Sequence, residues 1–192
     1  ILQVEELQFH LDPGPGALSK AKEYGINLHH NTAILLTHNH INHCNDVNAV
    51  LAAMSHNKLD IKGVLIANDT FVNGDETTKP YLTNFHKNCV ERIIIPAPDQ
   101  KIGIEDIEIK ALKTKHTDKK AIGFKFITPK FNIVYSSDTG YNAELIKEYA
   151  GTDILILNVV EPFDKKQEFN LNSDDAVNII QRVKPQLAII TH

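Results

Sequence analysis

Apolar residues recur along the chain in two spacings, and these spacings predict where strands and helices lie. Short apolar runs are typical of buried strands, whereas apolar residues three and four positions apart are typical of one helix face. Strands are predicted at 33–37, 63–67, 92–95, 104–112, 121–127, 132–136, 153–160 and 187–191, of which 33–37, 63–67 and 187–191 are expected to be buried. Helices are predicted at 17–24, 47–55, 142–149 and 173–182, with an extended stretch at 1–11 and a polar loop at 68–80.

The order of these elements predicts the fold class. Helices alternate with strands at both ends of the chain, and strands follow one another in the middle. This order is typical of sheets covered by helices, an α/β sandwich. Without an internal repeat or a linker, the chain is expected to be a single domain over 1–192. Because residue 1 is Ile, we expect that N-terminal strands and the C-terminal end of the natural chain are missing.

The composition excludes several classes of protein. Of 192 residues, 42% are hydrophobic and 23% are charged, which is typical of a globular chain and not of a disordered or fibrous one. No apolar run approaches the roughly 18 residues of a membrane span, so no membrane contact is expected. The two cysteines, Cys44 and Cys89, make no disulfide framework and favour a reducing cytoplasmic location.

Three histidines gather where the buried strand at 33–37 ends. The sequence there is Thr37-His38-Asn39-His40-Ile41-Asn42-His43. A strand directs His38 and His40 to the same side because side chains alternate with a period of two. The following turn brings His43 back towards them. Neutral imidazole is the commonest metal ligand, so this segment predicts a metal site.

The His-x-His-x-x-His motif after a buried strand, with Asp12-Pro13-Gly14 upstream, resembles the metallo-β-lactamase fold superfamily. The later ligands of that family have counterparts in the same order: His116 between two strands, Asp138 in Ser137-Asp138-Thr139-Gly140, and His192 after the final strand, which we expect to be buried. The turn from Asp12 to Leu18 looks closest to the ribonuclease Z-like branch.

This resemblance implies a four-layer αββα sandwich with a two-metal site between the edges of two sheets. It implies that His38, His40 and His116 hold the first metal, that His43 and His192 hold the second, and that Asp138 bridges both. Such ligands suit zinc, with iron or manganese as alternatives. In the family, Asp12 supports the site without binding a metal. A metal-bound hydroxide is then the expected nucleophile of a hydrolase.

Position 42 departs from the family motif, because Asn42 stands where the motif has Asp as the third protein ligand of the second metal. Asn offers only a neutral carbonyl oxygen and cannot act as a base. We therefore expect a weakened second metal site and slower hydrolysis, with Asn42 and Asp138 as the catalytic candidates. The sequence leaves open whether Asn42 is a natural variant or a deliberate substitution.

A second departure lies at Asn170, where ribonuclease Z-like members have a His that contacts the scissile phosphate. Asn can donate a hydrogen bond to an oxyanion but cannot deliver a proton. The alternative is a polar loop that caps the helix predicted at 173–182. This departure argues against processing of tRNA precursors. Beside His43, Cys44 either approaches the second metal or is a small buried apolar residue.

Positive charge concentrates in residues 110–130, which hold seven lysines and one acid. This segment carries a net charge of +6, whereas the remaining chain carries −10. Because these lysines surround His116, Lys115 and Lys119 are candidates for binding an anionic substrate. The alternative is that they lie on solvated strand faces. The chain has no Trp, so no base-stacking platform is evident.

These observations predict a cytoplasmic, dinuclear-metal hydrolase that acts on an anionic phosphodiester, either a small molecule or RNA. Two alternatives remain. One is a hydrolase of lactones or β-lactams, because similar ligands serve several reactions on this fold. The other is a catalytically weakened member that binds an anion or a partner, which Asn42 and Asn170 favour. A homodimer is left open.

Overall fold

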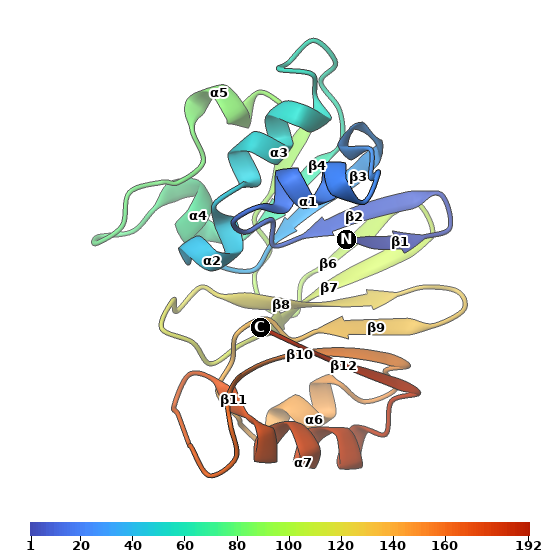
Figure 1. Cartoon of the computed structure of the whole chain (residues 1–192), viewed down its shortest axis with the longest axis vertical. Coiled ribbons are helices and arrows are strands. Elements are labelled where there is room, and N and C mark those ends of the chain that lie inside the picture. The colour runs from blue at the N-terminus through green and yellow to red at the C-terminus, as the bar shows by residue number, and fades with distance from the viewer. The chain divides into compact units, whose positions relative to one another are not determined.

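The computed structural model describes residues 1–192, which form two compact units, Ile1–Pro96 and Ala97–His192. The ribbon in Figure 1 shows the elements of each unit in chain order. That the two units make one domain stays a prediction. None of the helices combines the length and the apolar character that a bilayer crossing needs.

The unit Ile1–Pro96 contains a five-stranded sheet in the order β1-β2-β3-β4-β5. Its strands are β1 (Leu2–Val4), β2 (Leu7–Leu11), β3 (Asn31–Leu36), β4 (Val64–Ala67) and β5 (Arg92–Ile94). β1 and β2 form an antiparallel hairpin, and the pairs from β2 to β5 are parallel. The carboxyl ends of β2, β3 and β4 therefore lie at one edge of this sheet.

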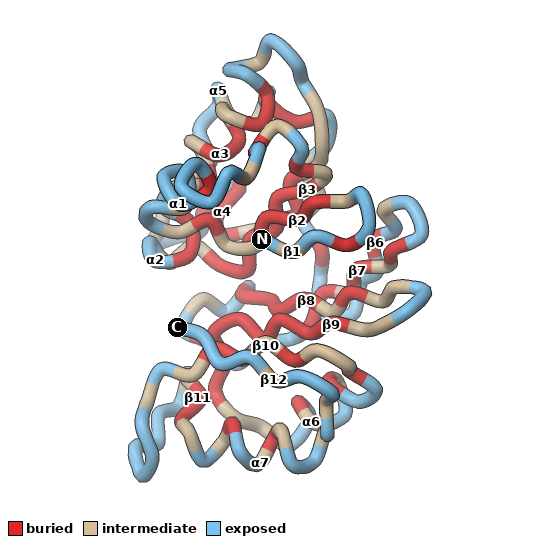
Figure 2. The backbone as a smooth tube through the Cα atoms, turned by 45° about the vertical axis from the view of Figure 1, so that its right-hand side comes forward, coloured by how far each residue is buried: buried red, intermediate tan, exposed pale blue.

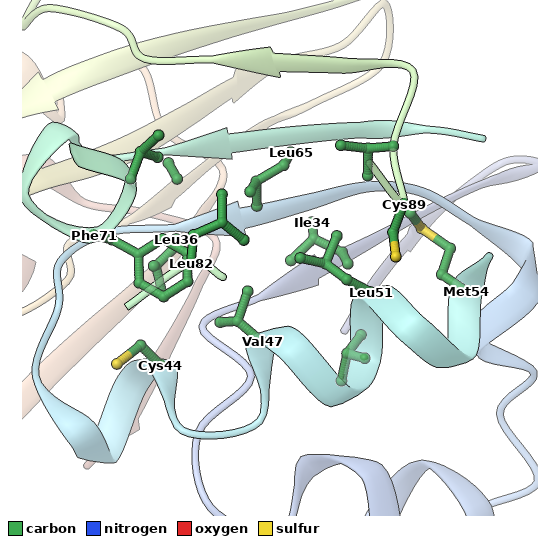
Figure 3. Close-up of a cluster of buried hydrophobic side chains, with 14 of the residues drawn as sticks. Ile34, Leu36, Cys44, Val47, Leu51, Met54, Leu65, Phe71, Leu82 and Cys89 are labelled. Atoms are coloured by element: carbon green, nitrogen blue, oxygen red, sulfur yellow. The ribbon is translucent and has the colours of Figure 1, made fainter. Parts of the chain in front are cut away.

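Helices connect these parallel strands. They are α1 (Ala17–Glu23), the 3₁₀ turn η1 (Leu28–His30), α2 (Ile41–Cys44), α3 (Val47–Met54), α4 (Asp69–Asn73) and α5 (Asn84–Lys87). The apolar spacing predicts α3 correctly, because Val47, Leu51 and Met54 share one face and are fully buried. Figure 3 shows these side chains against Ile34 and Leu65 of the sheet. Each such side chain stabilises the fold by about 1.5–3 kcal/mol.

The unit Ala97–His192 contains a seven-stranded sheet in the order β11-β10-β9-β8-β7-β6, with β12 also paired to β10. Its strands are β6 (Lys101–Ile104), β7 (Ile107–Lys113), β8 (Ile122–Ile127), β9 (Asn132–Tyr135), β10 (Ile154–Glu161), β11 (Leu171–Asn172) and β12 (Leu187–Thr191). β6 to β9 form an antiparallel meander, whereas β9, β11 and β12 run parallel to β10.

Two helices belong to this second unit, α6 (Glu144–Glu148) and α7 (Ser173–Val183). Ala176 and Ile179 of α7 belong to one apolar cluster with Leu155 and Leu157 of β10. Asn172 caps α7, because its side chain accepts from the N–H of Asp175 while the Asp175 carboxylate accepts from the N–H of Asn172. This reciprocal capping box fixes where the helix begins. Each unit thus combines a sheet with helices, as the predicted α/β class requires.

Three local predictions need correction. The extended stretch 1–11 is a hairpin, and 104–112 is split between β6 and β7 by a turn. The predicted loop 68–80 contains α4. Asn68 caps this helix, and Phe71 is fully buried although its neighbours in the sequence are mostly polar. At the start of α3, the side chain of Asp46 accepts from the N–H of Leu18 and does not cap the helix.

The prediction of a buried final strand is wrong. β12 is an edge strand that pairs only with β10, and most of its side chains are exposed, as the pale blue tube in Figure 2 shows. Ile190 is 52% exposed. An apolar run indicates a strand, but it does not distinguish a central strand from an edge strand.

Candidate metal centre

Asp12 and Thr37 lie side by side at the carboxyl edge of the first sheet, because β2 and β3 are parallel neighbours. The N–H of Asp12 donates to the carbonyl of Leu35 at 2.9 Å. The N–H of Thr37 donates to Oδ1 of Asp12 at 2.8 Å, and the Thr37 hydroxyl donates to Oδ2 at 2.7 Å. Two strand ends are thus joined by one carboxylate.

The three histidines of the motif gather at this edge. His40 precedes α2 with an extended backbone, and its carbonyl accepts from the N–H groups of His43 and Cys44. This single helical turn brings His43 back, so its ring centroid lies 4.2 Å from that of His38. The ring of His40 lies 4.7 Å from that of His38. Ligand atoms of His38 and His40 lie within 4.8 Å of each other.

Hydrogen bonds define which nitrogen of His38 and His43 carries the proton. Nδ1 of His43 lies 2.9 Å from Oδ2 of Asp12, and an ionised carboxylate can only accept. The Thr37 hydroxyl has one proton, which it donates to Asp12, so it accepts from Nδ1 of His38 at 3.0 Å. Both rings therefore carry the proton on Nδ1 and keep the Nε2 lone pair for a metal.

The turn after Asp12 packs against the backbone of α2. A Cβ on Gly14 would lie 2.0 Å from the carbonyl oxygen of Asn42, a distance that no side chain tolerates. The carbonyl of Pro13 also accepts from the N–H of Asp46 at 2.9 Å. Glycine at position 14 therefore allows the turn to hold the histidine loop in place.

The side chain of Asn42 is exposed, whereas Cys44 is fully buried. The Cys44 thiol donates to the carbonyl of Asn39 at 3.3 Å. Burial and the neighbouring Asp12 carboxylate raise the pKa of this thiol to about 12. Because the thiol is fully buried and donates to a backbone carbonyl, Cys44 packs as a small buried side chain. Both cysteines are free and buried.

In the second unit, Asp138 follows β9 and is held by β10. Its side chain is buried, and Oδ1 accepts from Nδ2 of Asn158 at 3.0 Å. The N–H of Asn158 donates to Oγ of Ser136 at 3.0 Å, which ties the two strand ends together. Asn158 is itself 2% exposed and interrupts the apolar sequence of β10.

His116 lies in the β7–β8 loop, where bonds to its own ring and to the backbone of the preceding residue hold it. Its Nδ1 lies 3.1 Å from the carbonyl oxygen of Phe169, which can only accept, so the proton is on Nδ1 and Nε2 is left for a metal. The N–H of Lys115 donates to Oγ1 of Thr139, and the N–H of Gly140 donates to the carbonyl of Lys115. A ligand atom of His116 lies within 4.8 Å of one in Asp138.

His192 follows β12. Together with His116 and Asp138 it makes up the second cluster, and His38, His40 and His43 make up the first. Its Nδ1 lies 3.8 Å from Oδ1 of Asp138. Because β12 pairs with β10 in parallel register, Thr191 is the partner of Asn158. Asp138, Asn158 and His192 therefore come together at the carboxyl ends of three parallel strands.

The residues of both clusters fit a divalent metal. His38, His43 and His116 each use Nδ1 on a protein acceptor, which is the usual arrangement of histidines that bind metal through Nε2. Imidazole nitrogen with one carboxylate is a donor set suited to zinc and other transition metals. These clusters indicate that the protein binds divalent metal.

Several lysines of residues 110–130 are bound within their own unit. Nζ of Lys110 lies 2.6 Å from Asp99 and 3.0 Å from Glu148. Nζ of Lys125 donates to the carbonyl of Ala150 at 2.7 Å. Lys115 lies 3.4 Å from Glu168, whereas Lys119 is exposed. The field of this segment is therefore weaker than its charge of +6 indicates.

Asn170 directly follows the residue whose carbonyl holds His116, and it is half-buried. It is not the helix cap, because Asn172 has that role. Sequence reasoning missed Thr37 and Asn158 as supports of the clusters. For Asn158 a signal exists, since an amide inside an apolar strand must have a partner. The carbonyl of Phe169 has no signal in the sequence.

Known proteins resemble this chain over most of its length. The family model of the β-lactamase superfamily domain matches residues 8–192. The uncharacterized protein MJ1374 of Methanocaldococcus jannaschii is 31% identical over 193 residues, covering 100% of this chain and 73% of that protein.

Solved structures show the same fold. The metallo-β-lactamase fold protein YhfI of Bacillus subtilis gives a TM-score of 0.83 at 22% identity, covering 99% of this chain and 75% of YhfI. A diphosphatase of the PhnP family gives 0.73 at 19% identity, covering 99% and 70%. The short form of human tRNase Z gives 0.72 at 15% identity, covering 100% and 83%.

The resemblance predicted from the histidine motif is thereby confirmed, including the likeness to ribonuclease Z. Because the family model extends over nearly the whole sequence, this chain belongs to the β-lactamase superfamily domain family and has the metallo-β-lactamase fold.

Proposed function

We propose that this protein is a metal-dependent hydrolase of phosphodiesters, with a small phosphodiester or RNA as its substrate. One observation carries the proposal: His38 and His43 of the motif, together with His116, each have Nδ1 bound to a protein acceptor, which leaves Nε2 as the metal-binding nitrogen. Structural neighbours include a diphosphatase and a tRNase, and both names refer to phosphorus esters or anhydrides.

Two divalent metals, zinc in the first instance, are the proposed cofactors. We assign His38, His40 and His116 to the first metal and His43 and His192 to the second, with Asp138 shared by both. The assignment rests on the family resemblance and on the donor chemistry of each cluster. Bound metals would activate water and neutralise charge that develops on a phosphoryl oxygen.

The remaining site residues act on the substrate. Lys119 is exposed and can attract an anion, whereas Lys115 must exchange its Glu168 partner for the substrate. The amide of Asn170 can donate to a phosphoryl oxygen but cannot protonate a leaving group. These roles favour a substrate whose leaving group needs little assistance. Two free, buried cysteines support a reducing compartment such as the cytosol.

Asn42 supports a second candidate function, a catalytically weakened member that binds an anion or a partner. A neutral amide oxygen in place of a carboxylate lowers the charge available to the second metal and removes a proton acceptor. Under this alternative the first metal binds normally, and turnover is close to background. The two candidate functions predict different hydrolysis rates for a variant that has a carboxylate at position 42.

The test compares the wild-type chain with Asn42→Asp. Zinc content by elemental analysis and hydrolysis of bis(p-nitrophenyl) phosphate are measured for both proteins. We expect Asn42→Asp to bring zinc to two per chain and to raise the hydrolysis rate at least tenfold. Asn45→Asp, which adds the same charge to an exposed position one turn of α2 away, should change neither quantity.

The opposite outcome is also informative. Unchanged zinc content and no phosphodiester hydrolysis in either protein would overturn the hydrolase proposal and leave the binding function. Hydrolysis of a lactone or β-lactam in the same assay series, without phosphodiester hydrolysis, would correct the substrate class.

A further inference from the structure

Thr37 lies between the Asp12 carboxylate and the His38 ring, and it is fully buried. A hydroxyl has one proton to donate, and in Thr37 that proton goes to Oδ2 of Asp12 at 2.7 Å. The oxygen of the same hydroxyl can then only accept at its second contact, Nδ1 of His38 at 3.0 Å. The Asp12 carboxylate therefore makes the Thr37 hydroxyl an acceptor towards His38, which places the ring proton of His38 on Nδ1.

The same carboxylate also holds His43. Oδ2 of Asp12 accepts from Nδ1 of His43 at 2.9 Å, and the side chains of both residues are 5% exposed. Asp12 thus acts on one histidine directly and on a second through Thr37. In the proposed assignment these histidines belong to different metals, so this inference rests on the proposed function.

We propose that Thr37 is a positioning residue that sets the His38 tautomer, so that the Asp12–Thr37 pair places ligands of both metals. Neither residue is in the donor set. A neutral imidazole binds metal only through the nitrogen without a proton. If His38 carried its proton on Nε2, the ring would have to change tautomer before it could bind.

Valine tests this role because it has nearly the shape of threonine and no hydroxyl. Thr37→Val removes the acceptor for Nδ1 of His38 but leaves the bond between His43 and Asp12 in place. Supports of this kind typically change metal affinity by about 10–100-fold. We therefore expect the first metal to bind at least tenfold more weakly, while the second metal binds within about twofold of wild type.

Two further variants complete the set. Thr37→Ser restores the hydroxyl and should restore the affinity of wild type. Thr152→Val removes another buried threonine hydroxyl, one that has no hydrogen-bond partner, and should leave metal affinity unchanged. Asp12→Asn should weaken both metals together, because it acts on His43 and, through Thr37, on His38.

The experiment uses the full chain, stripped of metal and then titrated with zinc against a chelating dye. In the metal-free protein, ring ¹⁵N shifts of the histidines are recorded by NMR, which reports the tautomer independently of metal and activity. Wild-type His38 should show the proton on Nδ1, and Thr37→Val should show both tautomers. A merely structural threonine would change thermal stability without changing these shifts.

Two results would overturn the inference. One is a wild-type His38 with its proton on Nε2, and the other is a Thr37→Val protein with wild-type ring shifts and zinc affinity. Failure of the proposed function would look different, because a chain that binds zinc and responds to Thr37→Val but hydrolyses no phosphodiester would retain the positioning role.

Discussion

In the unit Ile1–Pro96, three histidines come from the six residues 38–43, and one carboxylate holds one of them directly and a second through Thr37. In the unit Ala97–His192, His116, Asp138 and His192 follow three different strands. Their supports are a backbone carbonyl and a neutral amide, provided by Phe169 and Asn158. The first cluster is thus local and has a charged support, whereas the second is assembled from distant segments and has neutral supports.

This difference predicts which substitutions each cluster tolerates. Side-chain chemistry holds the first cluster, so loss of a hydroxyl or a carboxylate should disturb it most. Backbone position holds the second cluster, because a carbonyl supports His116 and backbone bonds join the loops at Lys115 and Gly140. Changes that move the backbone should therefore affect the second cluster more than the first.

The largest effect is expected from Gly140→Ala. A Cβ at this position would lie 1.8 Å from the carbonyl oxygen of Glu168, so the backbone beside Phe169 must shift and the support of His116 is lost. Overpacking against rigid backbone should cost about 3 kcal/mol or more. The midpoint temperature of thermal unfolding should fall by roughly 6–12 °C for a chain of this size. Zinc should also bind more weakly.

Gly103→Ala is the matched control, because a Cβ there meets nothing within 4 Å. Its unfolding temperature should stay within about 1 °C of wild type, since an open site adds no overpacking. If Gly140→Ala were as stable as this control, the backbone account of the second cluster would be wrong.

A smaller effect is expected from Asn158→Leu, which keeps the volume but removes the amide that donates to Asp138. Zinc affinity should fall about 10–100-fold, because the carboxylate loses its fixed orientation. Asn178→Leu, which removes the amide that donates to the Tyr141 hydroxyl in the same unit, should leave zinc affinity unchanged. Competition with a chelating dye measures both. Equal losses in the two variants would indicate a general loss of stability.

The smallest effect concerns acid stability of the first unit. Burial lowers the pKa of His10 from 6.5 to about 4, so the folded state excludes a proton that the unfolded state binds. Stability from this group is complete above pH 6.5 and decreases as the pH falls towards 4. Near pH 5.5 the metal-free protein should have lost about 1 kcal/mol relative to pH 7.5.

Urea unfolding at both pH values measures this difference, with His10→Gln as the variant and His30→Gln at an exposed histidine as the control. The acid-dependent loss should shrink by about 1 kcal/mol in His10→Gln and stay in His30→Gln. Hydrogen exchange should place the opening in β2, within the first unit. Identical pH dependence in all three proteins would contradict the role of His10.

Much of the fold could be predicted because its strands are continuous apolar runs and α3 has a clear apolar face. The misses have physical reasons. α4 lies in a mostly polar stretch of sequence where Thr70, Phe71 and Val72 are buried, and β12 has the composition of a central strand but lies at an edge. A local sequence pattern does not determine whether a strand lies at the centre or at the edge of a sheet.

The candidate site divides in the same way. The histidines at 38–43 are recognisable from spacing alone, whereas His116, Asp138 and His192 were found only through the family resemblance. Thr37 and Asn158 could not be assigned as supports, because their roles depend on which strand ends become neighbours. The role of the Phe169 carbonyl could not be predicted from side-chain types, because every residue has a backbone carbonyl.

The close packing of Gly14 on the carbonyl of Asn42 has a consequence for how such a site evolves. Folding constrains the backbone of residue 42, while its side chain is exposed. Selection for a stable fold therefore fixes glycine at position 14 but leaves Asn or Asp at position 42 to be chosen by chemistry. Asn and Asp codons differ by one base. A lineage can thus lose or regain the proposed metal ligand at position 42 in one mutational step, without compensating changes elsewhere in the scaffold.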